Sequence, residues 1–240
     1  MQTVTSYILI HKLTSGKKKS SLFVHVRSGI DERNTNVETP ESNDGGNMAA
    51  FAASLQHDVD AVISVAGSID EVASDAFVSA IKKCTGRVLV TGLGKSGVVA
   101  RRMAVSLAST GSPAHFVHAA EWVHGDLGSA CQGDVVIAFS HSGKTAECVQ
   151  IAAQLEARGV RLLAIAGVQD SPLVNASDSA VVYTIPSGAE PVGGAPTTSV
   201  VAQEAVVNAV VNELIARRGF TEADFKFNHP GGSLGQSLKH

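Results

Sequence analysis

The chain has 240 residues, of which 44% are hydrophobic. This is enough for one α/β domain with some peripheral chain and too short for two large domains. A formal net charge of -3 argues against a general nucleic-acid binder. Three scattered cysteines without CxxC spacing fit a reducing compartment, the cytoplasm. No apolar run approaches the roughly 18 residues of a membrane span, so no membrane partner is predicted.

Residues 1–47 differ in composition from the rest of the chain. Lys and Arg without any acid occupy 11–27, and residues 28–47 mix Asp and Glu with Asn, Ser and Gly. We therefore predict a disordered extension over 1–47 and a single domain over 48–240. Two alternatives stay open: a transit peptide, because the start is basic and acid-poor, and a second start of the protein at Met48.

Apolar spacing predicts a helix over 49–65, and Ser68 with Glu71 three residues later resembles a capping box that begins a second helix. Beyond Gly86, short apolar runs alternate with helical patterns. Strands are predicted at 87–91, 114–117, 134–139, 160–166 and 180–184, with helices ending near Thr110 and Arg158 and a long helix over 197–218. This alternation predicts a three-layer αβα sandwich with a five-stranded parallel sheet of the flavodoxin-like type. Ligands bind such sheets at the carboxyl ends of the strands.

The first strand leads into Gly92-Leu93-Gly94-Lys95-Ser96-Gly97, which matches the GxGxxG of dinucleotide sites. Two observations disfavour NAD or NADP. Lys95 brings a cation into the turn, which suits a sugar oxygen or phosphate better, and a second phosphate-type loop follows later. A P-loop is excluded because the order GxxxxGK[ST] is absent.

That second loop is Ser140-His141-Ser142-Gly143-Lys144-Thr145, which follows the third strand and is predicted to open a helix. Three hydroxyls and a glycine at a helix N-terminus favour an anion. Ser140, Ser142 and Thr145 can each donate to phosphate oxygens. An ordinary Ser-rich cap is the alternative, but two such loops in one sheet indicate phosphate binding.

Five motifs in this order carry a resemblance to a known family: GLGKSG, LASTGSPAHFVHAAEWVHGDLG, SHSGKT, APTTS and RGFTEADFKFNHPGGSLG. Together they resemble the sugar isomerase (SIS) domain of the arabinose 5-phosphate isomerase family, over about 65–238. The resemblance implies interconversion of D-arabinose 5-phosphate and D-ribulose 5-phosphate without an organic cofactor, usually to feed Kdo synthesis. It also implies a short form without the CBS modules of commoner members.

Carried over motif by motif, the resemblance places Lys95, Glu147, Glu190 and His229 around the substrate, with His124 from HGDLG. In related domains the histidine that matches His229 enters the site of a neighbouring subunit, which implies a homo-oligomer, favoured to be a tetramer. Three features depart from the family. His141 and Lys144 replace the usual Asn and Glu of the loop, and the segment between Glu190 and Ala195 is two residues shorter.

Isomerisation through an enediol needs a proton shuttle and a group that stabilises the developing oxyanion. We assign the carbon base to His229 or Glu147, with Glu190 as an orienting group or alternative base, and substrate polarisation to Lys95. Gly94, Ser96, Ser140, Ser142 and Thr145 hold the phosphate, and His124 contacts the substrate. His118, Glu121 and His124 have metal-ligand spacing, but no fourth ligand is evident, so we predict no required metal and at most inhibitory zinc at His124.

Two other classes of function stay open. The first is another SIS reaction, such as a different sugar-phosphate isomerisation or a lyase acting on an amino-sugar phosphate. The second is a non-catalytic sugar-phosphate sensor, as SIS domains serve in some regulators. Sensors of that kind need a DNA-binding or partner module, and residues 1–47 show no helix-turn-helix pattern.

Overall fold

Five short strands form one sheet at the centre of the part of the chain that the structure describes, residues 48–231 of a computed structural model. The predicted extension over 1–47 and the residues from 232 onward lie outside the described residues. The sheet order is β2-β1-β3-β4-β5 and all pairs are parallel. The strands are β1 (Val88–Gly92), β2 (Ala114–His118), β3 (Val135–Ser140), β4 (Arg161–Ala166) and β5 (Ser179–Val182). All five predicted strands are confirmed, each within two residues.

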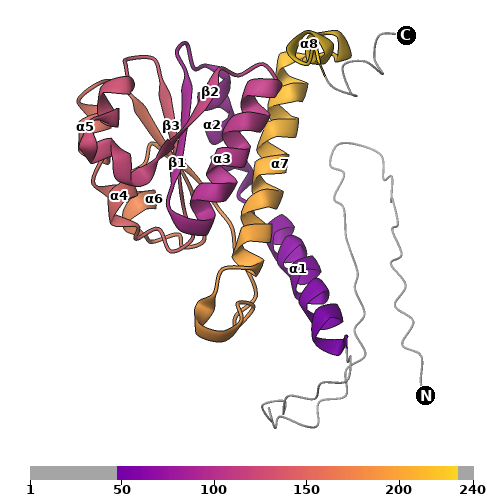
Figure 1. The fold of residues 1–240 in the computed structure, drawn as a ribbon. Coiled ribbons are helices and arrows are strands. Elements are labelled where there is room, and N and C mark those ends of the chain that lie inside the picture. Colours follow the sequence, from indigo (N-terminus) through magenta and orange to yellow (C-terminus); the bar gives the residue numbers. More distant parts are fainter. Residues whose placement is uncertain (1–47, 232–240) are drawn as a thin grey trace, which may run out of the picture. The chain divides into compact units, whose positions relative to one another are not determined.

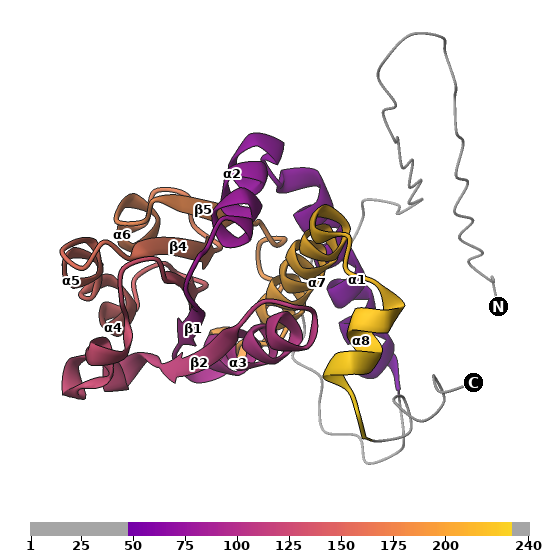
Figure 2. The same ribbon diagram turned by 90° about the horizontal axis from the view of Figure 1, so that it is seen from above.

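Helices cover both faces of this sheet (Figures 1 and 2). One face carries α1 (Ala49–Ser68), α2 (Glu71–Lys82), α3 (Gly94–Ser109) and α7 (Thr198–Arg218). The other carries α4 (Ala146–Val149), α5 (Ala152–Glu156), α6 (Pro172–Asn175) and the 3-10 turn η1 (Ala119–His124). Successive strand residues alternate between the two layers, so Val88 and Val90 pack on the first face and Leu89 on the second. The predicted three-layer sandwich is therefore confirmed.

One predicted helix start is wrong, and one predicted helix is divided. Helix α1 continues to Ser68, whose hydroxyl donates to the Val65 carbonyl (3.1 Å), and the cap of α2 is Asp70, whose carboxylate accepts from Ala73 N (2.9 Å). The helix predicted after the second loop begins at Ala146, directly after Thr145, but divides into α4 and α5, although Gln150 and Ile151 between them keep right-handed helical backbone angles.

Helix α7 is long and apolar enough, by length and composition alone, to cross a membrane, contrary to the absence of such a run predicted from the sequence. Its packing points to a different role. One side of the helix, including Ala202, Val206 and Val210, is buried in the core. The helix packs against α1, α2 and α3, so it serves as a core helix of this domain.

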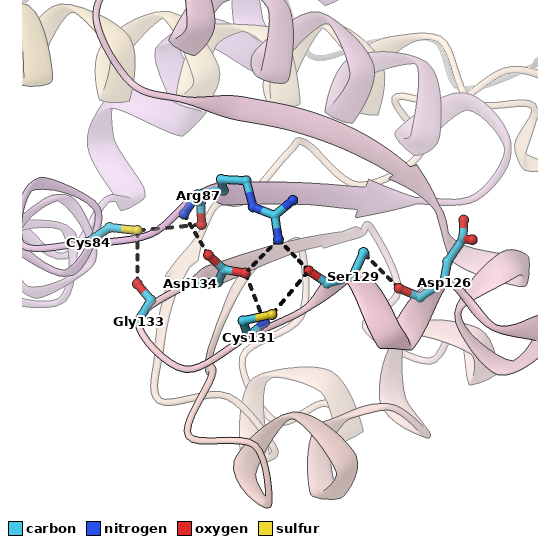
Figure 3. Close-up of polar contacts among 7 residues, drawn as sticks. All are labelled: Cys84, Arg87, Asp126, Ser129, Cys131, Gly133 and Asp134. Carbon is cyan, nitrogen blue, oxygen red and sulfur yellow. Dashed lines mark hydrogen bonds and ion pairs between the residues drawn. The ribbon is translucent and has the colours of Figure 1, made fainter.

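The amino ends of β1 and β3 are fastened by Asp134, which is 4% exposed. Its carboxylate accepts from Arg87 N (2.6 Å) and Cys131 N (2.9 Å) and pairs with the Arg87 guanidinium (3.3 Å) (Figure 3). The same guanidinium donates to the Ser129 carbonyl, and the Cys84 thiol donates to the Gly133 carbonyl (3.3 Å). This edge is opposite to the predicted ligand edge. The contacts around Asp134 therefore fix the relative position of β1 and β3 and take no part in catalysis.

Replacing Asp134 with Ala is expected to lower the free energy of unfolding by about 2 kcal/mol, because two part-buried N–H groups lose a buried charged acceptor. Urea denaturation would measure the loss. The control is Asp170→Ala, which removes an exposed carboxylate and is expected to change stability by less than about 0.5 kcal/mol. Equal effects of the two variants would contradict the role assigned to Asp134.

Candidate active site

Most of the predicted site residues lie where neighbouring strands end, and His229 does not. In the parallel register Gly92 lies beside His118 and Phe139, and Ser140 lies beside Ala166. Strand order reverses between β1 and β3, so the turns that follow these two strands diverge, and ligands of such sheets bind outside the strand ends at this point. The structure thus brings the GLGKSG turn, the SHSGKT loop and η1 to one edge, as predicted from the sequence.

The first turn brings its backbone close to the strand that precedes it. A Cβ on Gly97 would lie 2.8 Å from the Gly92 carbonyl oxygen, so only glycine fits there. Helix α3 starts at Gly94 with no acid in its first turn and no side-chain cap. Lys95 is exposed in that turn, and the Ser96 hydroxyl accepts from Gln203 Nε2 (3.0 Å). A positive helix end with an added lysine favours an anionic or oxygen-rich ligand.

The second loop is held by hydrogen bonds among its own side chains and backbone. Ser140 Oγ and Thr145 Oγ1 are 2.8 Å apart, and Ser142 Oγ accepts from Lys144 N (3.2 Å). Gly143 N donates to the Ser140 carbonyl (3.1 Å), and Leu173 N donates to the Gly143 carbonyl (2.9 Å). Ser140 is 2% exposed, whereas Ser142 is exposed. The loop therefore offers its donors from the turn itself, since the helix behind it has only four residues.

Gly143 has φ +64°, and a Cβ there would lie 2.0 Å from Ser171 Oγ and 2.4 Å from Ser171 Cβ. Gly143→Ala is therefore expected to displace the loop, to lower the free energy of unfolding by about 3 kcal/mol and to weaken sugar-phosphate binding about tenfold or more. Denaturation and titration calorimetry would measure the two effects. The control is Gly188→Ala, which has a similar φ (+72°) but open space around the new methyl. Only strain is expected there, with binding unchanged, and unaltered binding by Gly143→Ala would contradict the proposed loop role.

Glu147 lies half-buried in the first turn of α4, and this helix packs against η1, which ends in the exposed His124. The neighbouring Cys148 is fully buried, and burial raises the pKa of its thiol to about 12. That thiol stays protonated near neutral pH and is a poor nucleophile. Glu147 is therefore the group in this helix that is suited to proton transfer.

His118, Glu121 and His124 do not form a metal cluster. Their spacing falls on the end of β2 and on η1 rather than on an α-helix. Within residues 48–231 no three His, Cys, Asp or Glu side chains come together closely enough to hold a metal ion. Trp122 points inward and donates to Thr91 Oγ1 (2.9 Å), which anchors η1 against β1.

Glu190 caps the N-terminus of α7. Its Oε2 accepts from Thr197 N (2.8 Å) and Thr198 N (3.1 Å), and its Oε1 accepts from Ser199 N (2.8 Å). Burial raises the pKa of Glu190, but the hydrogen bonds from Ser199 and Thr197 outweigh it and hold the pKa below its usual value. In this arrangement the carboxylate is a weak base, and Oε1 accepts one hydrogen bond and keeps a second lone pair, which favours an orienting role over the alternative of a base.

His229 lies far from the ligand edge of its own chain. It follows α8 (Glu222–Asn228), stacks on Phe225 with ring centroids 3.9 Å apart, and its Nδ1 lies 2.8 Å from the Phe225 carbonyl oxygen. Asn228 donates to the Ser109 carbonyl at the end of α3 (3.1 Å), whereas Lys95 lies at the start of that helix. Sixteen residues of α-helix, about 24 Å, separate the two ends.

Two polar residues near the site were not singled out from the sequence. Tyr183 follows β5 and is 0% exposed, and Gln203 on α7 is 1% exposed. The Tyr183 hydroxyl lies 2.9 Å from His141 Nδ1 in the second loop, and Gln203 reaches Ser96 in the first turn. The sequence signal that could have found Gln203 is that it is an amide on the apolar side of a long helix, between Ser199 and Val206.

Comparison with known proteins relates the chain to proteins with a SIS domain. The family model described as SIS domain matches residues 81–213. Arabinose 5-phosphate isomerase KdsD of Salmonella typhi is 41% identical over 173 residues, which cover 71% of this chain and 53% of that protein. KdsD of Pseudomonas aeruginosa is 43% identical over 153 residues, covering 64% and 47%. The chain thus spans about half the length of these curated relatives.

A solved structure of an Escherichia coli CFT073 protein in complex with arabinose 5-phosphate matches with a TM-score of 0.73 and 34% identity. The match covers 79% of this chain and 100% of that one. The parallel five-stranded sheet and the family match agree with one another. The chain belongs to the SIS domain family and is related to arabinose 5-phosphate isomerase KdsD.

Proposed function

We propose that the protein interconverts D-arabinose 5-phosphate and D-ribulose 5-phosphate. The observation that carries the proposal is that a hydroxyl-rich loop, a lysine and a carboxylate meet at one edge of the sheet. The match to a structure that holds arabinose 5-phosphate supports this choice of substrate.

In this scheme the phosphate binds the loop of Ser140, Ser142 and Thr145 together with Gly94 and Ser96 at the start of α3. The sugar then extends toward η1 and α4, where His124 contacts its hydroxyls. Lys95 stabilises negative charge on the substrate oxygens, and Glu190 orients hydroxyls from the loop before α7. The scheme uses no group beyond the protein and the sugar.

The base, Glu147 or His229, removes the proton from C2 of the open-chain aldose. The electron pair of that bond forms the C1–C2 double bond while O1 takes up a proton, which gives an enediol. The proton then returns to C1, and O2 loses its proton and becomes the ketose carbonyl. No atoms are gained or lost overall, so a proton shuttle and an oxyanion partner suffice.

The position of His229 supports a homo-oligomer, favoured to be a tetramer, in which this histidine completes the site of a neighbouring subunit. In addition, α1 presents Phe51, Leu55, Val59 and Val62 along one side, each between 41% and 59% exposed. Spacings of four, four and three residues place them in one apolar stripe. A subunit contact along α1 would bury it. A cytoplasmic location and a supply of product to Kdo synthesis complete the proposal.

The test uses EDTA-treated protein with D-arabinose 5-phosphate and follows the formation of ribulose 5-phosphate. Ribose 5-phosphate and glucose 6-phosphate serve as alternative substrates. Rapid conversion of the arabinose compound alone is expected. Tight binding without turnover of any of the three would overturn the enzyme proposal and leave a sugar-phosphate sensor. Faster turnover of another sugar would assign a different SIS reaction.

A further inference from the structure

The imidazole of His141 and the hydroxyls of its loop lie toward opposite faces of the sheet. His141 Nδ1 lies 2.9 Å from the hydroxyl of Tyr183, which packs in the core on the face that carries α7. Ser140 Oγ instead lies 2.8 Å from Thr145 Oγ1 at the start of α4, on the other face. This is the arrangement expected of consecutive residues at the end of a strand. His141 is therefore set apart from the predicted phosphate hydroxyls.

The imidazole lies over the end of β4. The His141 carbonyl accepts from Gly167 N (2.9 Å), and a Cβ on Gly167 would lie 2.5 Å from Nδ1 and 2.6 Å from Cε1 of the ring. The Tyr183 ring lies 5.8 Å away, centroid to centroid. Among residues 48–231, Nε2 has no hydrogen-bond partner, yet it is not one of the buried unpaired atoms, so it reaches the surface. One edge of the ring is thus held by the fold, and Nε2 is open to a ligand.

The contact with Tyr183 decides which ring nitrogen carries the proton. Burial raises the pKa of the Tyr183 phenol. Burial also lowers the pKa of His141, although the Glu190 carboxylate opposes that fall. Both groups are therefore neutral near neutral pH. An imidazole nitrogen is a better acceptor than a phenol oxygen, so the hydroxyl donates to Nδ1 and the ring proton lies on Nε2.

We infer that His141 is a substrate-binding residue that donates from Nε2 to a hydroxyl of the sugar, and that Tyr183 is the positioning residue that fixes it as a donor. This inference rests on the proposed function. In that scheme the hydroxyls of Ser140 and Thr145 hold the phosphate on the α4 side, so a donor on the α7 side meets the sugar. Tyr183 is 0% exposed, so ring and proton are in place before the ligand binds.

His141→Asn and His141→Gln form a matched pair of variants. The amide of Asn ends near the position of Nδ1 and can still pair with Tyr183, whereas the amide of Gln ends near the position of Nε2. The Asn variant is expected to raise the Kd and KM for D-arabinose 5-phosphate about threefold to tenfold, with kcat changed less than about twofold. The Gln variant is expected to recover most of that affinity. Calorimetry with inorganic phosphate alone is expected to give the native Kd for both.

Long-range proton–nitrogen NMR spectra report the tautomer of His141 without any need for turnover. The His141 signals, identified by their absence from the Gln variant, are expected to show the proton on Nε2 in the native protein. Tyr183→Phe is expected to give a mixture of both tautomers. A native protein with the proton on Nδ1 would overturn the inference, because Nε2 would then be an acceptor. An equal loss of affinity for inorganic phosphate in the Asn variant would also overturn it, because the contact would be to phosphate.

The inference and the proposed function fail in different ways. Turnover by the native protein, with Kd and KM unchanged in His141→Asn, would overturn the inference and uphold the function. A raised Kd in this variant without turnover by the native protein would overturn the function and uphold the contact with the sugar. Absence of binding of D-arabinose 5-phosphate by the native protein would overturn both.

Discussion

Glu147→Gln is expected to lower kcat for D-arabinose 5-phosphate by about a thousandfold while KM changes less than about threefold. The amide has the shape of the carboxylate and can still accept a hydrogen bond, but it cannot take up the C2 proton. Glu147 is half-buried in the first turn of α4, the helix that directly follows the loop of Ser140, Ser142 and Thr145. Loss of kcat without loss of binding is therefore the pattern expected of a base.

The matched control is Glu156→Gln at the exposed end of α5, which is expected to leave both kinetic constants unchanged. Exchange of the C2 proton with deuterated water, followed by NMR, separates the chemical step from product release. A Glu147→Gln protein that exchanges this proton at the native rate would assign the carbon base to His229 instead.

His229→Asn is expected to lower kcat about a hundredfold or more. Oligomers that contain both this variant and Glu147→Gln are expected to regain part of the activity. Co-expressed with Glu147→Gln, it forms mixed pairs in which one site has both native groups, provided that His229 serves the neighbouring subunit. Random pairing makes half of the pairs mixed, each with one of two sites intact, so about a quarter of the native activity is expected.

If each site used the His229 of its own chain, every site in the mixture would carry one defect, and no activity would return. Two affinity tags allow the mixed species to be purified and assayed. The separation of His229 from Lys95 by the full length of α3 favours the repaired outcome. A mixture with no activity, from oligomers shown to contain both chains, would contradict the proposal that subunits share sites.

The sheet could be predicted because each strand is a short apolar run that is followed by a turn. This pattern is present in the local sequence and needs no tertiary information. A helix cap depends on which of several neighbouring hydroxyl and carboxylate groups reaches the free amides of the first turn. The sequence pattern fits both Ser68 and Asp70, and only the structure shows that Asp70 is the cap. The short helix α8 was missed, although Thr221 and Asp224 form a capping box there. The contact of Glu190 with α7 and the contact of Tyr183 with His141 depend on tertiary placement and have no local signature.

The hydrogen bonds of Glu190 bear on how this region can change in evolution. Its carboxylate is fastened to the first amides of α7, so the segment over 191–196 is a closed loop whose two ends are tied together. Residues added to or removed from such a loop change its exposed part and leave the hydrogen bonds of Glu190 to α7 in place. The added cost in loop-closure entropy is small. A segment of a different length can therefore present the same carboxylate at the same point, which fits the prediction that this segment is two residues shorter than the family pattern. Drift in length at this position is expected to be tolerated among relatives, whereas replacement of Glu190 is not.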